Sequence, residues 1–200
     1  MNTNRYLPLF VIALATVWVG CKKDKVDPLI PPAPINEEEL ITDAYIIFTD
    51  AGGNTYEWHA ATDEGFGHDH GGGEHEEGEI HIHGDTLPAG TVLQAEIILL
   101  NRSVSPIDTI SHEVLAEGDE HQFFFIPEGV DASFSYLDQD EDGLPIGLLS
   151  QWTTGAAGSG EVKVFLRHGL NKSAAGVSNG DMTNAGGSTD LEIHFPAVFE

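Results

Sequence analysis

Apolar and polar residues alternate with a period of two in many segments of this chain, as they do in strands that bury one face. No segment combines helix caps with a sustained apolar period of about 3.6 residues. The strand-like segments, separated by turns rich in Gly, Asn and Asp, read ELITDAYIIFTD, TYEWHAAT, TVLQAEIILLN, HQFFFIP, ASFSYLD, GLPIGLLSQWTTG, GEVKVFLRHGL and TDLEIHFPAVF. The pattern is typical of an antiparallel sandwich or barrel. We expect an all-β domain, a single antiparallel β-sandwich of about eight strands.

The alternation also predicts which side chains share a face. In the segment 160–170, one face carries Val162, Val164, Leu166 and His168. In the last segment, the apolar residues of one face are Leu191, Ile193 and Phe195, and the opposite face carries Glu192 and His194.

Two connections can be predicted as well. The first two segments form a hairpin with its turn at 52–54, where the sequence is Gly-Gly-Asn. The polar stretch IDTISHEVLAEGDE, residues 107–120, forms either a short helix or an irregular crossing between strands.

The first twenty residues have the layout of a secretory signal. Arg5 precedes the apolar run LPLFVIALATVWV, which is shorter than the roughly 20 residues of a membrane span. Gly20 and then Cys21 follow at once, and this resembles the lipobox of bacterial lipoproteins, although Trp18 departs from the usual Leu. We expect residues 1–20 to be removed and Cys21 to carry lipid; the alternative is an ordinary signal peptide with an incidental cysteine. Since Cys21 is the only cysteine, no disulfide can form within the chain.

Residues 21–38 contain KKDKVDPLIPPAPINEE, which is charged and rich in proline. Such a segment buries too little surface to fold, and we interpret it as an extended tether. Residues 39–200 then form one β-sandwich domain. The lipid places the protein at the outer membrane, while the choice between the periplasmic and the cell-surface face stays open.

The formal net charge is −25, and the only basic side chains from residue 36 onward are Arg102, Lys163, Arg167 and Lys172. Such a surface repels nucleic acid and attracts cations. Nucleic-acid binding is therefore excluded. The acidity indicates either a role connected with cations or solubility alone.

A His-rich loop, residues 63–85, joins two predicted strands and contains GHDHGGGEHEEGEIHIHGD. Its end, EIHIHGD, alternates, so that two histidines share a face. Imidazole and carboxylate groups suit zinc, with Cu²⁺ or Ni²⁺ as alternatives. The candidate ligands are His68, His70, His75, His81, His83, Glu79 and Asp85. Ordering such a loop costs about 1–2 kcal/mol per residue, which favours labile metal capture over a rigid site. A solvated loop without a selected function is the alternative.

Asp138, Asp140 and Asp142 precede Gly143 in the D-x-D-x-D-G spacing that begins a calcium loop. The twelfth position of that pattern is Leu149, where a calcium loop needs Glu. We therefore favour a hairpin turn, with weak Ca²⁺ binding as the alternative.

His121 and His168 are predicted on core-facing positions near strand ends. A lone histidine in such a place is usually a hydrogen-bonded structural residue. If the two met in the fold with His112 or Glu113, they would form a second and more rigid metal site.

Catalytic motifs are missing from the sequence. It contains no G-x-S-x-G, no H-E-x-x-H and no phosphate-binding loop, and its one cysteine is assigned to lipid. We expect a protein that is not an enzyme.

The segments EHQFFF (120–125) and QWTTGAAGSGEVKVFLRHGLNKSAAGVSNGDMTNAGGSTDLEIHF (151–195) carry a family resemblance. The chain resembles envelope lipoproteins of Bacteroidota-type bacteria that are often labelled type 1 periplasmic-binding-fold proteins. That label implies a longer α/β fold, which the strand pattern does not support. The resemblance implies no reaction and no ligand residues, and it marks the His-rich loop as an elaboration of a common sandwich.

These observations together predict a lipid-anchored envelope protein whose His-rich loop captures a divalent transition metal, zinc above all. It would buffer the metal or deliver it to an outer-membrane transporter, with the TonB-dependent class as a candidate partner. The alternative is a surface lipoprotein that binds a protein, a peptide or a glycan through its sandwich, with the loop incidental.

Overall fold

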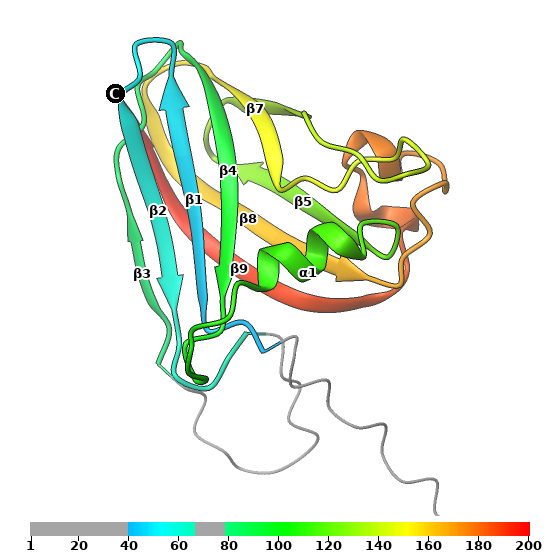
Figure 1. Ribbon diagram of the computed structural model, residues 1–200. Coiled ribbons are helices and arrows are strands. Elements are labelled where there is room, and N and C mark those ends of the chain that lie inside the picture. The colour runs from blue at the N-terminus through cyan, green and yellow to red at the C-terminus, as the bar shows by residue number, and fades with distance from the viewer. Residues whose placement is uncertain (1–39, 67–78) are drawn as a thin grey trace, which may run out of the picture. The chain divides into compact units, whose positions relative to one another are not determined.

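The computed structural model describes residues 40–66 and 79–200, which form two antiparallel sheets that face each other (Figure 1). The six-stranded sheet has the order β3-β2-β1-β4-β7-β6. Its strands are β1 (Asp43–Asp50), β2 (Thr55–Ala61), β3 (His81–Gly84), β4 (Val92–Leu100), β6 (Ala132–Tyr136) and β7 (Leu149–Thr154). The three-stranded sheet has the order β5-β8-β9, with β5 (His121–Glu128), β8 (Gly158–His168) and β9 (Ser188–Phe199). The prediction of an all-β sandwich is confirmed.

The predicted connections are also present. The β1–β2 turn is closed by the Asp50 carboxylate, which accepts hydrogen bonds from Gly52 N and from the backbone and side-chain nitrogens of Asn54. These bonds, above all the one from the Asn54 side chain, hold the pKa of Asp50 below its usual value. The polar stretch 107–120 contains a helix, α1 (Ile110–Ala116), which packs beside β4. None of the helices in the described part of the chain has the length and apolarity needed to span a membrane.

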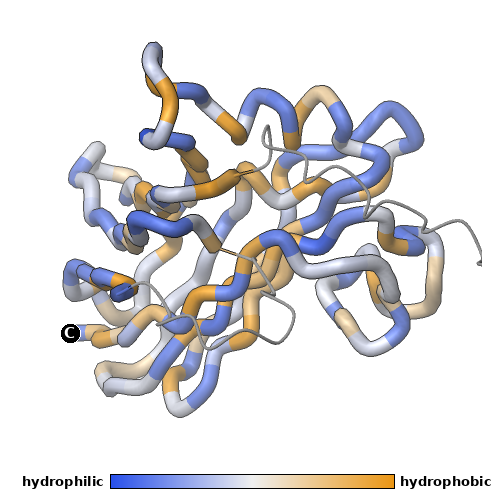
Figure 2. The backbone as a smooth tube through the Cα atoms, turned by 90° about the horizontal axis from the view of Figure 1, so that it is seen from below, coloured by the Kyte–Doolittle hydropathy of each residue, from blue (hydrophilic) through white to orange (hydrophobic). Residues whose placement is uncertain are grey.

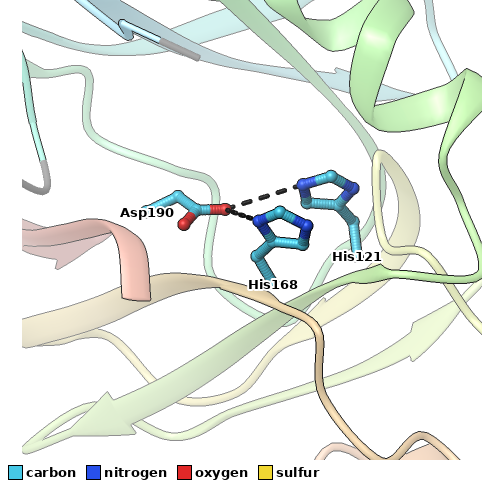
Figure 3. A group of neighbouring side chains, drawn as sticks. All are labelled: His121, His168 and Asp190. Carbon is cyan, nitrogen blue, oxygen red and sulfur yellow. Dashed lines mark ion pairs between the residues drawn. The ribbon is translucent and has the colours of Figure 1, made fainter. Parts of the chain in front are cut away.

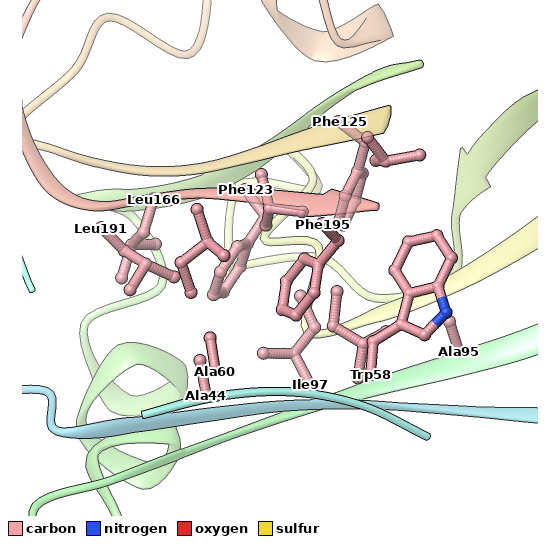
Figure 4. Packing of buried hydrophobic residues seen from close by; sticks show 14 of the residues in the cluster. Ala44, Trp58, Ala60, Ala95, Ile97, Phe123, Phe125, Leu166, Leu191 and Phe195 are labelled. Atoms are coloured by element: carbon pink, nitrogen blue, oxygen red, sulfur yellow. The ribbon is translucent and has the colours of Figure 1, made fainter. Parts of the chain in front are cut away.

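The core between the sheets is dominated by aromatic rings. Trp58 stacks on Phe195 across the sandwich at 5.5 Å, and Trp152 meets Phe125 edge-to-face at 5.2 Å between ring centroids. Figure 4 shows large side chains of β5, β8 and β9 opposite the small Ala44 and Ala60. Both buried indoles are satisfied, because the Nε1 group of Trp58 donates to the Asp85 carbonyl and that of Trp152 to the Ser150 hydroxyl.

The predicted faces are correct in β8 and in β9. Figure 2 shows the alternation of apolar and polar residues along the chain. The buried residues of the two strands include Val162, Val164, Leu166, Leu191, Ile193 and Phe195. Glu192 and His194 lie on the opposite face and hydrogen-bond to each other.

The acidic segment 138–149 forms a turn that is closed from within. Asp138 accepts hydrogen bonds from Gly147 N and Leu149 N, at 2.7 and 3.0 Å. One oxygen of Asp140 accepts from the backbone N–H groups of Asp142 and Leu144. These contacts support the hairpin-turn interpretation over calcium binding.

The other oxygen of Asp140 lies 2.6 Å from Lys172 Nζ, and both side chains are buried, with exposures of 2% and 3%. Lys172 Nζ also donates to the Gly118 carbonyl. Burial by itself raises the pKa of Asp140, but the hydrogen bonds from Lys172 and from the turn outweigh it and lower the pKa. An internal ammonium thus supplies the counter-charge of Asp140.

We expect Lys172→Met to destabilise the fold by about 3–5 kcal/mol, because it leaves the buried Asp140 carboxylate without its counter-charge. Urea unfolding followed by circular dichroism measures the change. Lys163→Met is the matched control, since Lys163 pairs with Glu128 near the surface, at 2.8 Å, and its loss should change stability little. Equal effects of the two substitutions would contradict the role given to the buried pair.

Tyr136 links the two sheets, because its hydroxyl donates to the Phe123 carbonyl at 2.7 Å. Burial raises the pKa of Tyr136 from 10.0 to about 12. The folded protein therefore holds this proton more tightly than the unfolded chain does. The resulting stability is present below pH 10 and is lost as the pH rises to about 12.

In urea titrations between pH 9 and about 12, we expect the wild-type protein to lose stability more steeply than Tyr136→Phe. The variant should also be about 1 kcal/mol less stable at neutral pH, because the Phe123 carbonyl loses its donor. Parallel stability curves for the two proteins would show that Tyr136 is not the titrating group.

Candidate metal centre

Two histidines of the three-stranded sheet lie directly opposite each other. His121 begins β5, His168 ends β8, and the register pairs them. Opposite residues of an antiparallel pair share a face, and here it is the core-facing one. His121 is almost fully buried, with a side-chain exposure of 3%, whereas that of His168 is 26%.

A β-bulge brings a carboxylate to the same place. Leu166 pairs with Leu191, but the next residue of β8, Arg167, pairs with Thr189, so Asp190 is an extra residue of β9. An extra residue shifts the alternation of faces and redirects a side chain. Asp190 Oδ2 lies 3.6 Å from His121 Nε2 and 3.9 Å from His168 Nδ1 (Figure 3).

Hydrogen bonds on the far side of each ring set the orientation of the imidazoles. His121 Nδ1 lies 3.1 Å from the Glu117 carbonyl, and His168 Nε2 lies 3.0 Å from a Glu120 carboxylate oxygen. Both partners only accept hydrogen bonds, so these nitrogens carry the protons. Metal binding requires neutral rings, whose lone pairs would then be on His121 Nε2 and His168 Nδ1, the two atoms that face Asp190. Carboxylates and carbonyls position metal-binding histidines in this way.

The three facing atoms lie within 4.8 Å of one another, and the group can hold a metal ion. The distances of 3.6 and 3.9 Å to Asp190 exceed the length of a charge-assisted hydrogen bond. They are closer to the spacing of about 3.3 Å between ligands of a tetrahedral zinc ion with bonds of about 2.0–2.1 Å.

The rings of His121 and His168 are stacked, with centroids 4.5 Å apart and planes inclined by 18°. A metal ion lies in the plane of each imidazole that binds it. Coordination of one ion by both rings therefore requires the two ring planes to tilt away from their stacked arrangement.

The His-rich loop is only partly described. His81 and His83 lie on the exposed edge strand β3, preceded by the exposed Glu79. His83 Nε2 lies 3.4 Å from Asp85 Oδ1, while Asp85 Oδ2 accepts from Glu57 N. The remaining candidates of this loop, His68, His70 and His75, lie outside the described residues, as does Cys21. Within 40–66 and 79–200, only the group of His121, His168 and Asp190 has three ligand atoms at metal-binding spacing.

The sequence suggests His112 or Glu113 as residues that would complete a site with His121 and His168, and the group of three ligand atoms in the structure contains Asp190. His112 and Glu113 lie on α1, and neither belongs to the three-ligand group. His112 instead lines a cavity of about 390 Å³ on the outer face of β4, with Ile98, Leu115 and Leu149.

Sequence reasoning missed Asp190, because strict alternation places it with Glu192 on the other face. The Gly186-Gly187 pair just before β9 is the only sequence signal that points to an irregular strand start.

Searches against protein-family models, curated proteins and solved structures find no match to this chain. The resemblance to Bacteroidota-type envelope lipoproteins therefore stays a prediction. The chemistry of the site rests on its own geometry.

Proposed function

We propose that this protein binds a divalent transition metal, zinc above all, through His121, His168 and Asp190. The observation that carries the proposal is the convergence of two oriented imidazoles and a carboxylate from β5, β8 and the β9 bulge. Two nitrogens and one oxygen suit zinc, copper and nickel. Zinc fits best. The right angles of a square-planar copper ion would bring neighbouring ligand atoms to about 2.8 Å. That would shorten the present distances of 3.6 and 3.9 Å to Asp190 more than tetrahedral zinc does.

A comparison with two other buried carboxylates supports the proposal. Asp43 is paired with Arg102 at 3.0 Å, and Asp140 is paired with Lys172 at 2.6 Å. Both therefore have a permanent counter-charge. In the described part of the chain, the ion-pair partners of Asp190 are histidines alone. When both imidazoles are neutral, as metal binding requires, a bound cation would supply the counter-charge of this carboxylate, whose exposure is 13%.

Access and charge agree with a role in metal capture. The 26% exposure of His168 leaves one side of the group open to solvent, and three protein ligands leave a fourth position for water or an incoming ligand. A net charge of −25 raises the local concentration of cations. In this proposal Cys21 carries the lipid anchor at the outer membrane. The protein then buffers the metal or passes it to an outer-membrane transporter, and the His-rich loop serves as a second, more labile collecting segment.

We expect Asp190→Asn to lower the affinity for zinc at least tenfold in isothermal titration calorimetry, because the amide removes the anionic ligand while keeping its shape. His194→Ala, which removes an exposed histidine of the same strand, should bind zinc as the wild type does. A third variant changes His68, His70, His75, His81 and His83 to Ala and should keep the tightest site. Unchanged affinity in Asp190→Asn together with loss of binding in this third variant would assign the metal to the loop instead.

We also expect Glu120→Gln to weaken zinc binding by roughly 10- to 100-fold, because a neutral amide orients His168 and supports its basicity less well. Competition with a chromophoric chelator measures the change. Glu192→Gln, which alters the partner of the exposed His194, is the matched control. If both variants bound zinc equally well, the orienting role of Glu120 would be wrong.

A further inference from the structure

The candidate metal-binding group lies where the chain leaves the three-stranded sheet after β8 and re-enters it at β9. We name this place the neck. Residues 169–187 leave the sheet after β8 and return to it before β9, and we name them the β8–β9 lobe. His168 is the last residue before the lobe, and Asp190 follows three residues after its end. An ion bound to both side chains would join the beginning of the lobe to its end and attach both to His121 of β5.

The lobe is a folded unit with a small core of its own. It contains η2 (Val177–Asn179) and η3 (Met182–Asn184). Its buried residues pack on β5 as a separate cluster of Phe124, Leu170, Val177 and Ala185. Asn171 N donates to the Ala185 carbonyl at 2.8 Å and ties its two ends together.

Arg167 closes the neck on the opposite face of the sheet. Its guanidinium donates to the carbonyls of Gly186 and Gly187, and to the Thr189 hydroxyl. Neighbouring residues of a strand point to opposite faces, so Arg167 and His168 hold the neck from two sides. The Arg167 side is closed by these charge-assisted hydrogen bonds and needs no bound metal. The other side consists of the acceptor atoms of His168 and Asp190, 3.9 Å apart.

We propose that metal occupancy of this group regulates the β8–β9 lobe by closing its neck; the proposal rests on the metal binding proposed above. Any opening that separates His168 from Asp190 has to release the ion. The bound metal therefore makes such an opening rarer by the factor 1 + [metal]/Kd. The lobe supplies Ser178 and Asn179 to a cleft of about 320 Å³ shared with Ser135 and Tyr136 of β6. By making neck opening rarer, the bound metal raises the fraction of molecules in which this cleft is intact.

Hydrogen exchange followed by mass spectrometry on the purified full-length protein tests the proposal. Exchange is compared in excess EDTA and with free zinc at about 100 times the Kd measured by calorimetry. Amides of the lobe that exchange through neck opening should slow by up to about 100-fold. Amides of the β1–β2 hairpin, which lies in the other sheet, should not change. Asp190→Asn should abolish the slowing.

Arg167→Met is the matched variant, because it loosens the neck without removing a metal ligand. We expect faster exchange of the lobe in EDTA and slowing by a similar factor when zinc is added. If zinc binds in calorimetry but lobe exchange stays the same, the regulation is wrong and the metal site stands. Equal slowing in the lobe and in the β1–β2 hairpin would also overturn the regulation, since it would indicate general stabilisation. Absence of zinc binding to the wild type would overturn both proposals.

Discussion

Each strand of an antiparallel sandwich places alternate side chains between the two sheets, and this constraint governs the whole molecule. It sends the aromatic rings of Trp58, Phe125 and Phe195 into one core. At the end of the three-stranded sheet the same rule directs His121 and His168 inward, where the core gives way to solvent. One extra residue in β9 then breaks the rule and adds Asp190 to them. The candidate metal centre is thus the product of regular alternation in two strands and a single irregularity in the third.

The carboxylates of this acidic chain are stabilised in different ways. Asp50 and Asp138 are satisfied by backbone N–H groups within their turns. Asp43 and Asp140 are deeply buried, and each is paired with one of the few basic side chains. In the part of the chain that the structure describes, Asp190 has neither kind of partner. Its carboxylate faces two imidazoles, which are cationic only when protonated. A site of this kind responds to its surroundings, whereas the two pairs with arginine and lysine hold the fold together.

The segment between α1 and β5 connects these features. The Glu117 carbonyl and the Glu120 side chain orient the two imidazoles, and the Gly118 carbonyl accepts from Lys172, which belongs to the β8–β9 lobe. The lobe therefore contacts the rest of the protein at its neck and through its buried lysine.

The sequence by itself determined the strands, their turns and the inward direction of His121 and His168, because a period of two is a local property that neighbouring residues express without tertiary contacts. It also determined that the acidic turn at 138–149 lacks the ligand set of a calcium loop. Only the tertiary structure decided that β5 and β8 pair with His121 opposite His168, since register depends on contacts far apart along the chain. It also decided that Asp190 lies beside His121 and His168. A bulge arises from the way two strands pair, and alternation within one strand cannot reveal it.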